Sequence, residues 1–146
     1  MSKQADLNLA KQYFEEVETL YDEGNYEKAM ELSQKSMTLY EKWEDWGEWT
    51  HVGSYIGAIY KELNQYKKGI SYLNHVIEVG ESHIGNNHHS SAKCLNNIGS
   101  HHFQLGDYTS ALQFYQKALD TWKSSLDEND PTLSIGFSNL GRCYAL

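Results

Sequence analysis

Residues 94–122 read CLNNIGSHHFQLGDYTSALQFYQKALDTW and have the pattern of two amphipathic helices joined by a tight turn. In the first helix, Leu95 and Ile98 recur at the spacing of one helix face. The second helix carries a longer stripe, made of Tyr108, Ala111, Leu112, Tyr115, Ala118, Leu119 and Trp122. Between the two, Gly106 can adopt the left-handed conformation that ends a helix, and Asp107 can cap the helix that follows. The stretch therefore predicts a helical hairpin.

The same frame recurs every forty-two residues. The three copies are Tyr55-Ile56-Gly57-x-x-Tyr60, Asn97-Ile98-Gly99-x-x-His102 and Asn139-Leu140-Gly141-x-x-Tyr144. A fixed period of this length indicates an array of helical hairpins. Because Gly99 and Ala111 are small where their neighbours are large, we expect the two helices of a hairpin to approach closely there.

These motifs resemble the tetratricopeptide repeat, in which Leu-Gly and Tyr mark the first helix and Ala and an aromatic residue mark the second. The matching residues are Leu95, Ile98, Gly99, Ala111 and Tyr115. His102 departs from the pattern by standing where Tyr is usual. The long linkers between repeats resemble the 42-residue, kinesin-light-chain-like variety, whose loop is matched by Gly85 and His88 and whose proline is kept at Pro131.

The resemblance implies an all-α fold, an α-α superhelix (a right-handed solenoid) of about three and a half repeats in a single domain over residues 1–146. We expect repeats at about 5–45, 46–86 and 87–129 and a final lone first helix at 131–146. The first helix of the second repeat should begin near Thr50. The last stripe, Phe137, Leu140 and Tyr144, has no partner helix after it. Either this helix caps the array or the chain is a piece of a longer protein, and the apolar stripe favours the second, because a cap should be polar on its outer face.

The chain has 146 residues, a formal net charge of −8 and a single proline. One proline suits a nearly all-helical chain, because proline breaks helix interiors. The acidic balance argues against unspecific nucleic-acid binding, and no apolar run approaches the ~18 residues that suggest a membrane span. The first residues also lack the apolar segment of a secretory signal. We therefore expect a cytoplasmic protein that binds neither nucleic acid nor membrane.

Acidic side chains concentrate in residues 1–50, which hold 12 acidic and 5 basic residues. This end either meets a basic partner or forms a solvated helix face, and the pattern favours the second interpretation. The two cysteines, Cys94 and Cys143, lie seven residues apart in repeat register, which is about 10 Å along a helix axis at ~1.5 Å per residue. This separation exceeds the reach of a disulfide, so both should be free.

Three tryptophans, Trp43, Trp46 and Trp49, stand within seven residues of one another. One interpretation is that they cover the junction between the first two repeats, since tryptophan is usually at least partly buried. The other is an aromatic binding patch, since tryptophan is enriched at interface hot spots.

All seven histidines lie between His51 and His102. The adjacent His101 and His102 point about 100° apart on a helix and cannot easily chelate one ion, and intracellular structural zinc sites usually use cysteine. His102 is instead expected to pack in the apolar stripe. Nothing near His89 and Ser90 supplies the orienting acid and oxyanion site that nucleophilic catalysis needs. We therefore expect no metal, no cofactor and no enzymatic activity.

Stacked hairpins form a concave surface, and the resemblance implies that the first helix of each repeat lines it. The polar positions beside the packing stripe are then the candidate ligand contacts. They are Tyr55, Lys93, Asn96, Asn97, Ser100, Asn139 and Arg142. Asn97 and Asn139 share one slot in consecutive repeats, where an amide offers a peptide backbone both a donor and an acceptor. Lys93 and Arg142 add positive charge, which favours a ligand with acidic groups. The other interpretation, equally open, is that these positions are only the solvated polar residues that every surface helix carries.

The sequence therefore predicts a non-catalytic protein-interaction scaffold that binds a peptide or helical segment of a protein partner in its groove. Two alternatives stay open. The first is a regulatory or scaffold segment of a larger bacterial signalling protein or enzyme whose activity lies beyond Leu146. The second is self-association, as a homodimer through the exposed stripe of the C-terminal helix.

Overall fold

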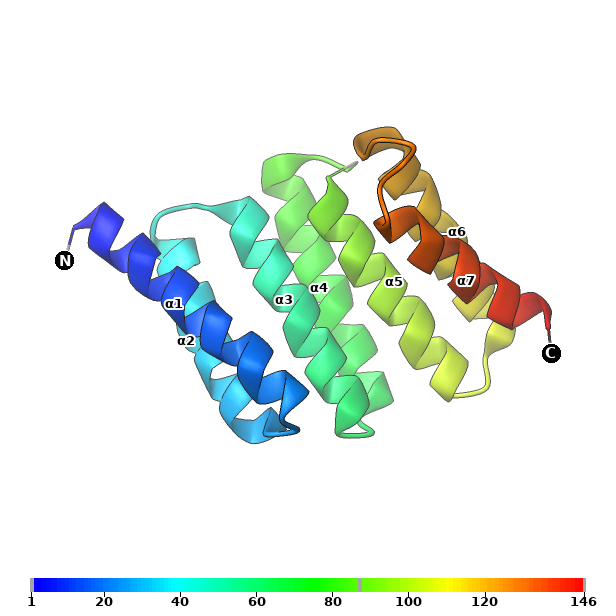
Figure 1. Ribbon diagram of the computed structural model, residues 1–146, viewed down its shortest axis with the longest axis horizontal. Coiled ribbons are helices and arrows are strands. Elements are labelled where there is room, and N and C mark those ends of the chain that lie inside the picture. Colours follow the sequence, from blue (N-terminus) through cyan, green and yellow to red (C-terminus); the bar gives the residue numbers. More distant parts are fainter. Residues whose placement is uncertain (1, 87, 146) are drawn as a thin grey trace.

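The computed structural model describes residues 2–86 and 88–145, and this part of the chain is built of helices. They are α1 (Lys3–Asp22), α2 (Tyr26–Lys42), α3 (Trp46–Glu62), α4 (Tyr66–Ile84), α5 (His89–Gln104), α6 (Tyr108–Ser125) and α7 (Thr132–Tyr144). Consecutive helices pair as antiparallel hairpins, α1 with α2, α3 with α4 and α5 with α6, while α7 packs on α6 (Figure 1). The predicted all-α repeat superhelix is confirmed.

Each hairpin turn contains a residue with a left-handed backbone. Gly24, Asn64 and Gly106 have φ angles of 79°, 59° and 82°. After the last of these turns, the carboxylate of Asp107 accepts a hydrogen bond from the Ser110 N–H at 3.1 Å and caps α6. The turn chemistry predicted for Gly106 and Asp107 is therefore confirmed.

The first helix of the second repeat begins earlier than the sequence suggested. We expected a start near Thr50, but α3 begins at Trp46. The reason is the cap: the carboxylate of Asp45 accepts from the Glu48 N–H at 3.3 Å. Thr50 lies one turn inside the helix, where its hydroxyl donates to the Trp46 carbonyl at 2.8 Å.

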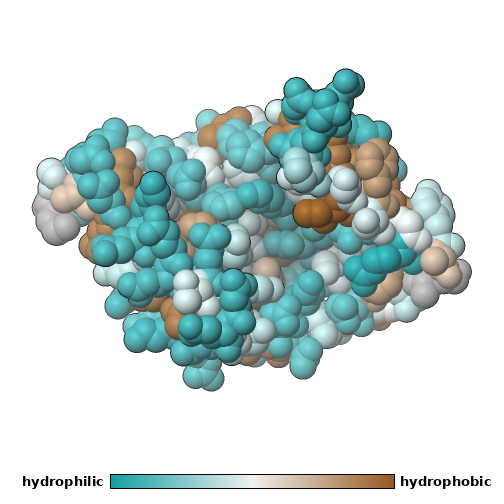
Figure 2. Space-filling model, in the orientation of Figure 1, coloured by the Kyte–Doolittle hydropathy of each residue, from teal (hydrophilic) through white to brown (hydrophobic). Residues whose placement is uncertain are grey.

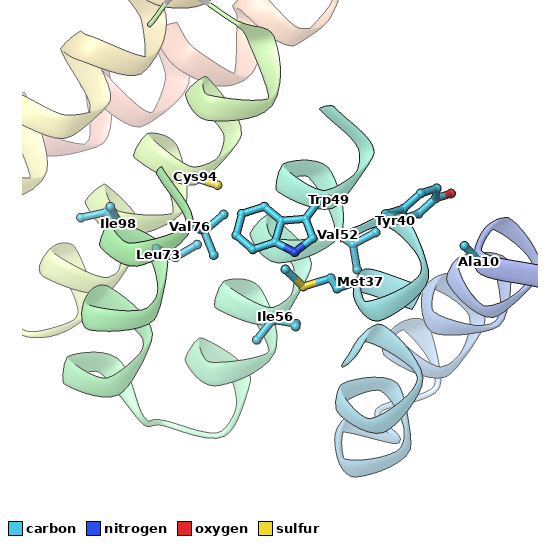
Figure 3. Close-up of a cluster of buried hydrophobic side chains, with 10 residues drawn as sticks. All are labelled: Ala10, Met37, Tyr40, Trp49, Val52, Ile56, Leu73, Val76, Cys94 and Ile98. Atoms are coloured by element: carbon cyan, nitrogen blue, oxygen red, sulfur yellow. The ribbon is translucent and has the colours of Figure 1, made fainter. Parts of the chain in front are cut away.

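The largest buried cluster surrounds α3 and joins five helices (Figure 3). Val52 and Ile56 of α3 are fully buried, and so are Leu73 and Val76 of α4 beside them. Trp49 belongs to the same cluster and is only 6% exposed. The middle repeat therefore holds the first and third repeats together through α3.

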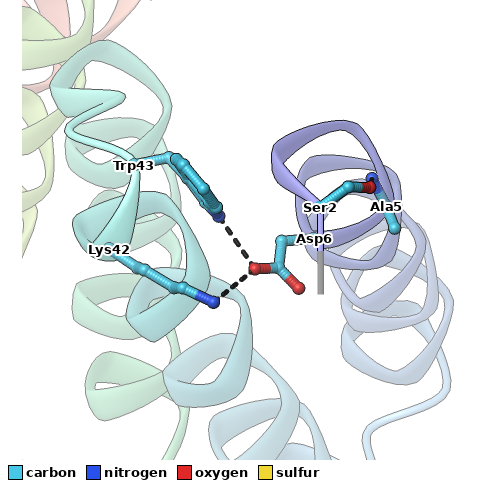
Figure 4. Close-up of polar contacts among 5 residues, drawn as sticks. All are labelled: Ser2, Ala5, Asp6, Lys42 and Trp43. Atoms are coloured by element: carbon cyan, nitrogen blue, oxygen red, sulfur yellow. Dashed lines mark hydrogen bonds and ion pairs between the residues drawn. The ribbon is translucent and has the colours of Figure 1, made fainter.

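The three tryptophans pack in different places: Trp49 lies in the buried cluster with Met37 and Tyr40 of α2, while Trp43 and Trp46 make contacts inside their own repeats. Half-buried Trp46 stacks on the ring of His83 with centroids 4.0 Å apart. Trp43 donates its indole N–H to the buried carboxylate of Asp6 at 2.8 Å, and Lys42 donates to the same oxygen at 2.7 Å (Figure 4). These contacts tie α1 to the end of α2, so all three indoles have packing roles.

The helices of a hairpin approach most closely at glycine. A Cβ atom on Gly99 would lie 2.8 Å from the Tyr115 ring, and one on Gly57 would overlap the side chain of Leu73. The close approach predicted at Gly99 is confirmed, and it repeats one repeat earlier.

The first helices α1, α3, α5 and α7 form one layer, and α2, α4 and α6 form the layer behind it (Figure 1). Seen from the first layer, the molecule is hollowed over α3 and α5, and the hollow is lined mostly by hydrophilic residues (Figure 2). Cys94 is buried and Cys143 half-buried, and both are free as predicted. None of the helices in the described ranges has the length and apolar character needed to cross a membrane.

Candidate functional site

Two adjoining hollows form one groove along the concave layer. The first has a volume of about 410 Å³ and is lined by α1, α3, α5 and α7, with Trp122 of α6. The second, of about 860 Å³, lies between α1, the start of α3 and the start of α5. Glu18 and Lys93 line both hollows and therefore mark the middle of the groove.

Four of the seven residues predicted from the sequence lie in this groove. Tyr55, Lys93, Asn96 and Asn97 all line the first hollow. They come from α3 and α5, whose spacing in the superhelix brings residues of neighbouring repeats to one surface. The first helices of the second and third repeats therefore supply the candidate ligand contacts.

The other three predicted residues line neither hollow. The hydroxyl of Ser100 accepts from the Lys61 ammonium at 3.1 Å. Asn139 is half-buried against α5. The guanidinium of Arg142 lies 4.5 Å from the centroid of the Phe103 ring, a cation–π contact outside the groove. Their contribution to ligand binding stays a prediction.

Asn97 and Asn139, at one repeat position, each bond the equivalent residue of the preceding repeat, but through different acceptor atoms. Asn97 donates its amide N–H to the main-chain carbonyl of Ser54 at 2.7 Å. Asn139 donates to the side-chain oxygen of Asn96 at 2.8 Å. Ser54 and Asn96 are also equivalent positions of consecutive repeats, so these bonds link α3 to α5 and α5 to α7. Each amide keeps a second N–H and its own carbonyl oxygen for other partners.

Lys93 is the cation at the centre of the groove. Its ammonium lies 2.9 Å from Nδ1 of His51, which accepts the hydrogen bond as an unprotonated nitrogen. Burial and the neighbouring Lys93 charge lower the pKa of His51 to about 4, so His51 is neutral at pH 7. Burial also lowers the pKa of Lys93. Within the described ranges, no carboxylate lies within ion-pair distance of Lys93.

Helix α1 adds an acidic wall to the groove; the sequence indicated the concentration of acidic residues in 1–50 but not that they line the groove. Glu18 and Asp22 line the first hollow, and Glu15 and Glu18 line the second. The hydroxyl of Tyr55 donates to the Glu18 carboxylate at 3.5 Å across the groove. The pattern hid this wall because Val17 stands where later repeats have glycine, which left the register of α1 uncertain.

Three rings join the α1 and α3 sides of the groove. The Phe14 ring meets the rings of His51 and Tyr55 edge to face, with centroids 5.0 and 4.9 Å apart. Such pairs stabilise beyond their buried area and hold ring orientation. The rings therefore give the groove a fixed apolar floor between the acidic wall and Lys93.

A histidine is buried in the core at position 101, next to His102, which we predicted to pack in the apolar stripe. His101 is fully buried, and its Nε2–H donates to the Gly57 carbonyl at 2.9 Å, while Nδ1 has no partner among the residues that the structure describes. Burial lowers its pKa to about 4. His102 packs as expected, stacked on Phe114 with centroids 5.4 Å apart.

The serine and histidine at the start of α5 serve to cap the helix. Nδ1 of His88 accepts from the Ser90 N–H at 3.1 Å and lies 2.6 Å from its hydroxyl, and Ser90 is buried. Among residues 2–86 and 88–145, no three His, Cys, Asp or Glu side chains gather as metal ligands.

The sequence and fold match known repeat proteins. The chain is 26% identical over 133 residues to the protein kinesin light chain-related 3 of Arabidopsis thaliana, covering 86% of this chain and 20% of that protein. The fold is similar to BtubC (BKLC) of P. vanneervenii, with a TM-score of 0.75, 22% identity and coverage of 94% of this chain and 56% of that one. It is also similar to the first TPR of Spaghetti (RPAP3) bound to an HSP90 peptide, with a TM-score of 0.60, 15% identity and 96% of both chains covered.

The chain thus spans one fifth of the length of its Arabidopsis relative and just over half of BtubC. The model of the tetratricopeptide repeat family matches residues 48–124 and again 94–146, which together cover more than half of the chain. The chain therefore belongs to the tetratricopeptide repeat family, and its repeats are of the kinesin-light-chain-like kind.

Proposed function

We propose that this chain is a non-catalytic protein-interaction scaffold whose groove holds an extended peptide or helical segment of a partner protein. The continuous pair of hollows lined by first helices supports this reading, because a peptide needs a long surface rather than a closed pocket. The similar Spaghetti domain is bound to an HSP90 peptide, so a fold of this kind accommodates such a ligand.

The observation that carries the proposal is the state of Lys93. Its ammonium is half-buried in the middle of the groove and is bonded to a neutral imidazole rather than to a carboxylate. An acidic group of a ligand would replace or join His51 and form a charge-assisted hydrogen bond. The ligand should therefore place an aspartate, a glutamate or a terminal carboxylate at Lys93.

The remaining groove residues would orient the ligand backbone. Asn96 and Asn97 keep polar atoms beyond the bonds they make within the chain. The Phe14, His51 and Tyr55 rings would contact an apolar side chain of the ligand. The acidic wall of α1 would oppose a ligand acid on that side, so the acidic group should face α5.

The test is a selection from a random displayed peptide library on the full wild-type chain, followed by affinity measurements of the selected peptides on the wild type and on the Lys93→Gln variant. Peptides enriched on the wild type should carry an acidic residue and should lose at least about tenfold in affinity on Lys93→Gln, as loss of a charge-assisted bond worth about 1.5–3 kcal/mol requires. Lys68→Gln is the control, because Lys68 is an exposed lysine of α4 that lines neither hollow. Peptides that bind both variants as tightly as the wild type would overturn the proposal.

A further inference from the structure

The contact between His51 and Lys93 fixes the protonation state of the imidazole. An ammonium can only donate, so Nδ1 of His51, 2.9 Å from Nζ of Lys93, carries no proton, and Nε2 carries the single ring proton. Both side chains are half-buried. Burial and the Lys93 charge lower the pKa of His51 to about 4, in agreement with this geometry. His51 is therefore held neutral by its burial and by the cation beside it.

Aromatic rings, rather than charged partners, hold the His51 imidazole in place. Phe14 of α1 meets it edge to face with centroids 5.0 Å apart, and Tyr55 of α3 does so at 5.8 Å. Across residues 2–86 and 88–145, no carboxylate lies within ion-pair distance of His51. Because the rings fix its orientation, the Nδ1 edge stays directed at Lys93, and its protonation depends on what binds there.

An acidic group bound to Lys93 would reverse the effects that keep His51 neutral. The carboxylate would accept the hydrogen bond that Lys93 gives to Nδ1, which frees the lone pair of that nitrogen for a proton. It would also place a negative charge within about 4–6 Å of the ring, where an opposite charge favours the protonated form of histidine. The imidazolium would then donate its Nδ1–H to the carboxylate in a charge-assisted hydrogen bond.

We propose that His51 is the second cationic contact of the groove, and that it takes up one proton from solvent when an acidic group of the ligand binds Lys93. The inference rests on the proposed function, since it needs a ligand acid at Lys93. The complex then binds more protons than the free chain, so the affinity rises as the pH falls below neutral. A site in which Lys93 alone meets the ligand would not behave in this way.

Other titratable groups line the same hollow and have to be separated from His51. The acidic ones are Glu15 and Glu18 of α1 with Asp45 and Glu48 at the start of α3, and the others are Lys11, Tyr40, His88 and His89. His88 is already engaged, because its Nδ1 accepts from the Ser90 N–H in the helix cap. His89 is exposed and would meet the same ligand charge. Substitution of the histidines one at a time therefore identifies the proton acceptor.

The test uses a peptide that is selected on the wild-type chain and loses affinity on Lys93→Gln, beside the same peptide with its acidic residue changed to the corresponding amide. Calorimetric titration at pH 7.5 and pH 5.5 measures the affinity, and two buffers of different ionisation enthalpy count the protons taken up. The acidic peptide should bind at least about threefold more tightly at pH 5.5, within the roughly tenfold per pH unit that one linked proton allows. The amide peptide should show neither the gain nor the proton uptake.

Substitutions in the protein assign the proton. His51→Gln keeps an acceptor for Lys93 but does not titrate, so it should bind the acidic peptide about as tightly as the wild type at pH 7.5 and lose the gain at pH 5.5. His89→Gln, beside the site, and His75→Gln, at an exposed position of α4, should keep the gain. In the wild type itself, the NMR signal of the His51 ring should titrate at a higher pH in the complex than in the free chain.

The outcomes distinguish this inference from the proposed function. Lys93-dependent binding that is equally tight at both pH values would overturn the inference and leave the proposed function standing. A gain at pH 5.5 that persists in His51→Gln, or a His51 signal that titrates at the same pH with and without the peptide, would do the same. A selection that yields no Lys93-dependent peptide would overturn both.

Discussion

The amide of Asn97 donates to the main-chain carbonyl of Ser54 across 2.7 Å, linking α5 to α3 at the concave surface. One repeat later, the amide of Asn139 donates to the side-chain oxygen of Asn96 at 2.8 Å and links α7 to α5. A residue type that suits ligand binding is therefore already used to hold the first helices together. A groove built this way is pre-organised, since its walls are fixed before a ligand arrives.

This arrangement predicts that Asn97→Ala lowers the free energy of unfolding by about 0.5–1.5 kcal/mol through the lost hydrogen bond. The matched control is Asn74→Ala, at an exposed position of α4, which changes helix propensity equally without touching the concave surface. Urea denaturation of the two variants measures the difference. Equal stabilities of the two variants would show that the Asn97 bond contributes nothing.

Gly57 and Gly141 occupy the same repeat position, but replacement by alanine should have opposite effects on stability at the two sites. Gly57→Ala should destabilise the chain by about 1–2 kcal/mol, because the new Cβ overlaps the buried Leu73 side chain and overpacking outweighs the gain in helix propensity. Gly141→Ala, in the same slot of α7, should stabilise it by up to about 1 kcal/mol, since nothing lies nearby. Thermal unfolding of both variants tests the pair. A stabilising Gly57→Ala would contradict the close approach.

Burial of His101 predicts a loss of stability in mild acid. Its folded pKa of about 4 lies below the ordinary value of 6.5, so the unfolded chain binds more protons between these values. The stabilisation of the folded chain by neutral His101 is complete above pH 6.5 and is lost as the pH falls toward 4. Its upper limit is about 3 kcal/mol of unfolding free energy. His51 contributes in the same direction.

His101→Gln separates the two histidines, because glutamine can still donate to the Gly57 carbonyl and does not titrate. Its free energy of unfolding, measured by urea denaturation from pH 7 to pH 4.5, should fall less steeply than that of the wild type. Identical slopes would mean that His101 is protonated without cost in the folded chain.

The contact of Asp6 with Lys42 and Trp43 predicts that Asp6→Ala loosens the first helix. The hydrogen bonds from Lys42 and Trp43 hold the Asp6 pKa below its ordinary value. The stabilisation that ionised Asp6 gives to the folded chain is therefore present above the ordinary pKa and is lost as the pH falls through the folded pKa. Hydrogen exchange at the amides of α1 should become faster, while Glu15→Ala, at an exposed residue of the same helix, should leave it unchanged. Unchanged exchange in Asp6→Ala would remove this role.

Local features were the ones that the sequence predicted well. Gly106 and Asp107 act within one turn, so their residue types sufficed. The slot of Asn97 was also readable, because it depends on the repeat period alone. Its partner Ser54 was not, since that bond depends on how far α5 is shifted against α3 in the superhelix.

The buried histidine shows how neighbouring helices decide a residue's role. The repeat period predicts packing for His102 alone, but the packing of α4 buries His101 completely. A signal was present in the sequence: Gly69 stands where the repeat usually has alanine, and a Cβ there would lie 2.5 Å from Nε2 of His101. The missing methyl group leaves room for the imidazole.

Peptide binding in the groove is the central claim, and it is tested most directly by amide shift mapping with a peptide selected on the chain. Addition of the peptide should perturb amides of α3 and α5 around Tyr55, Lys93 and Asn97, and Lys93→Gln should remove these perturbations at the same peptide concentration. Perturbations confined to α2, α4 and α6, or to the outer face of α7, would contradict the account.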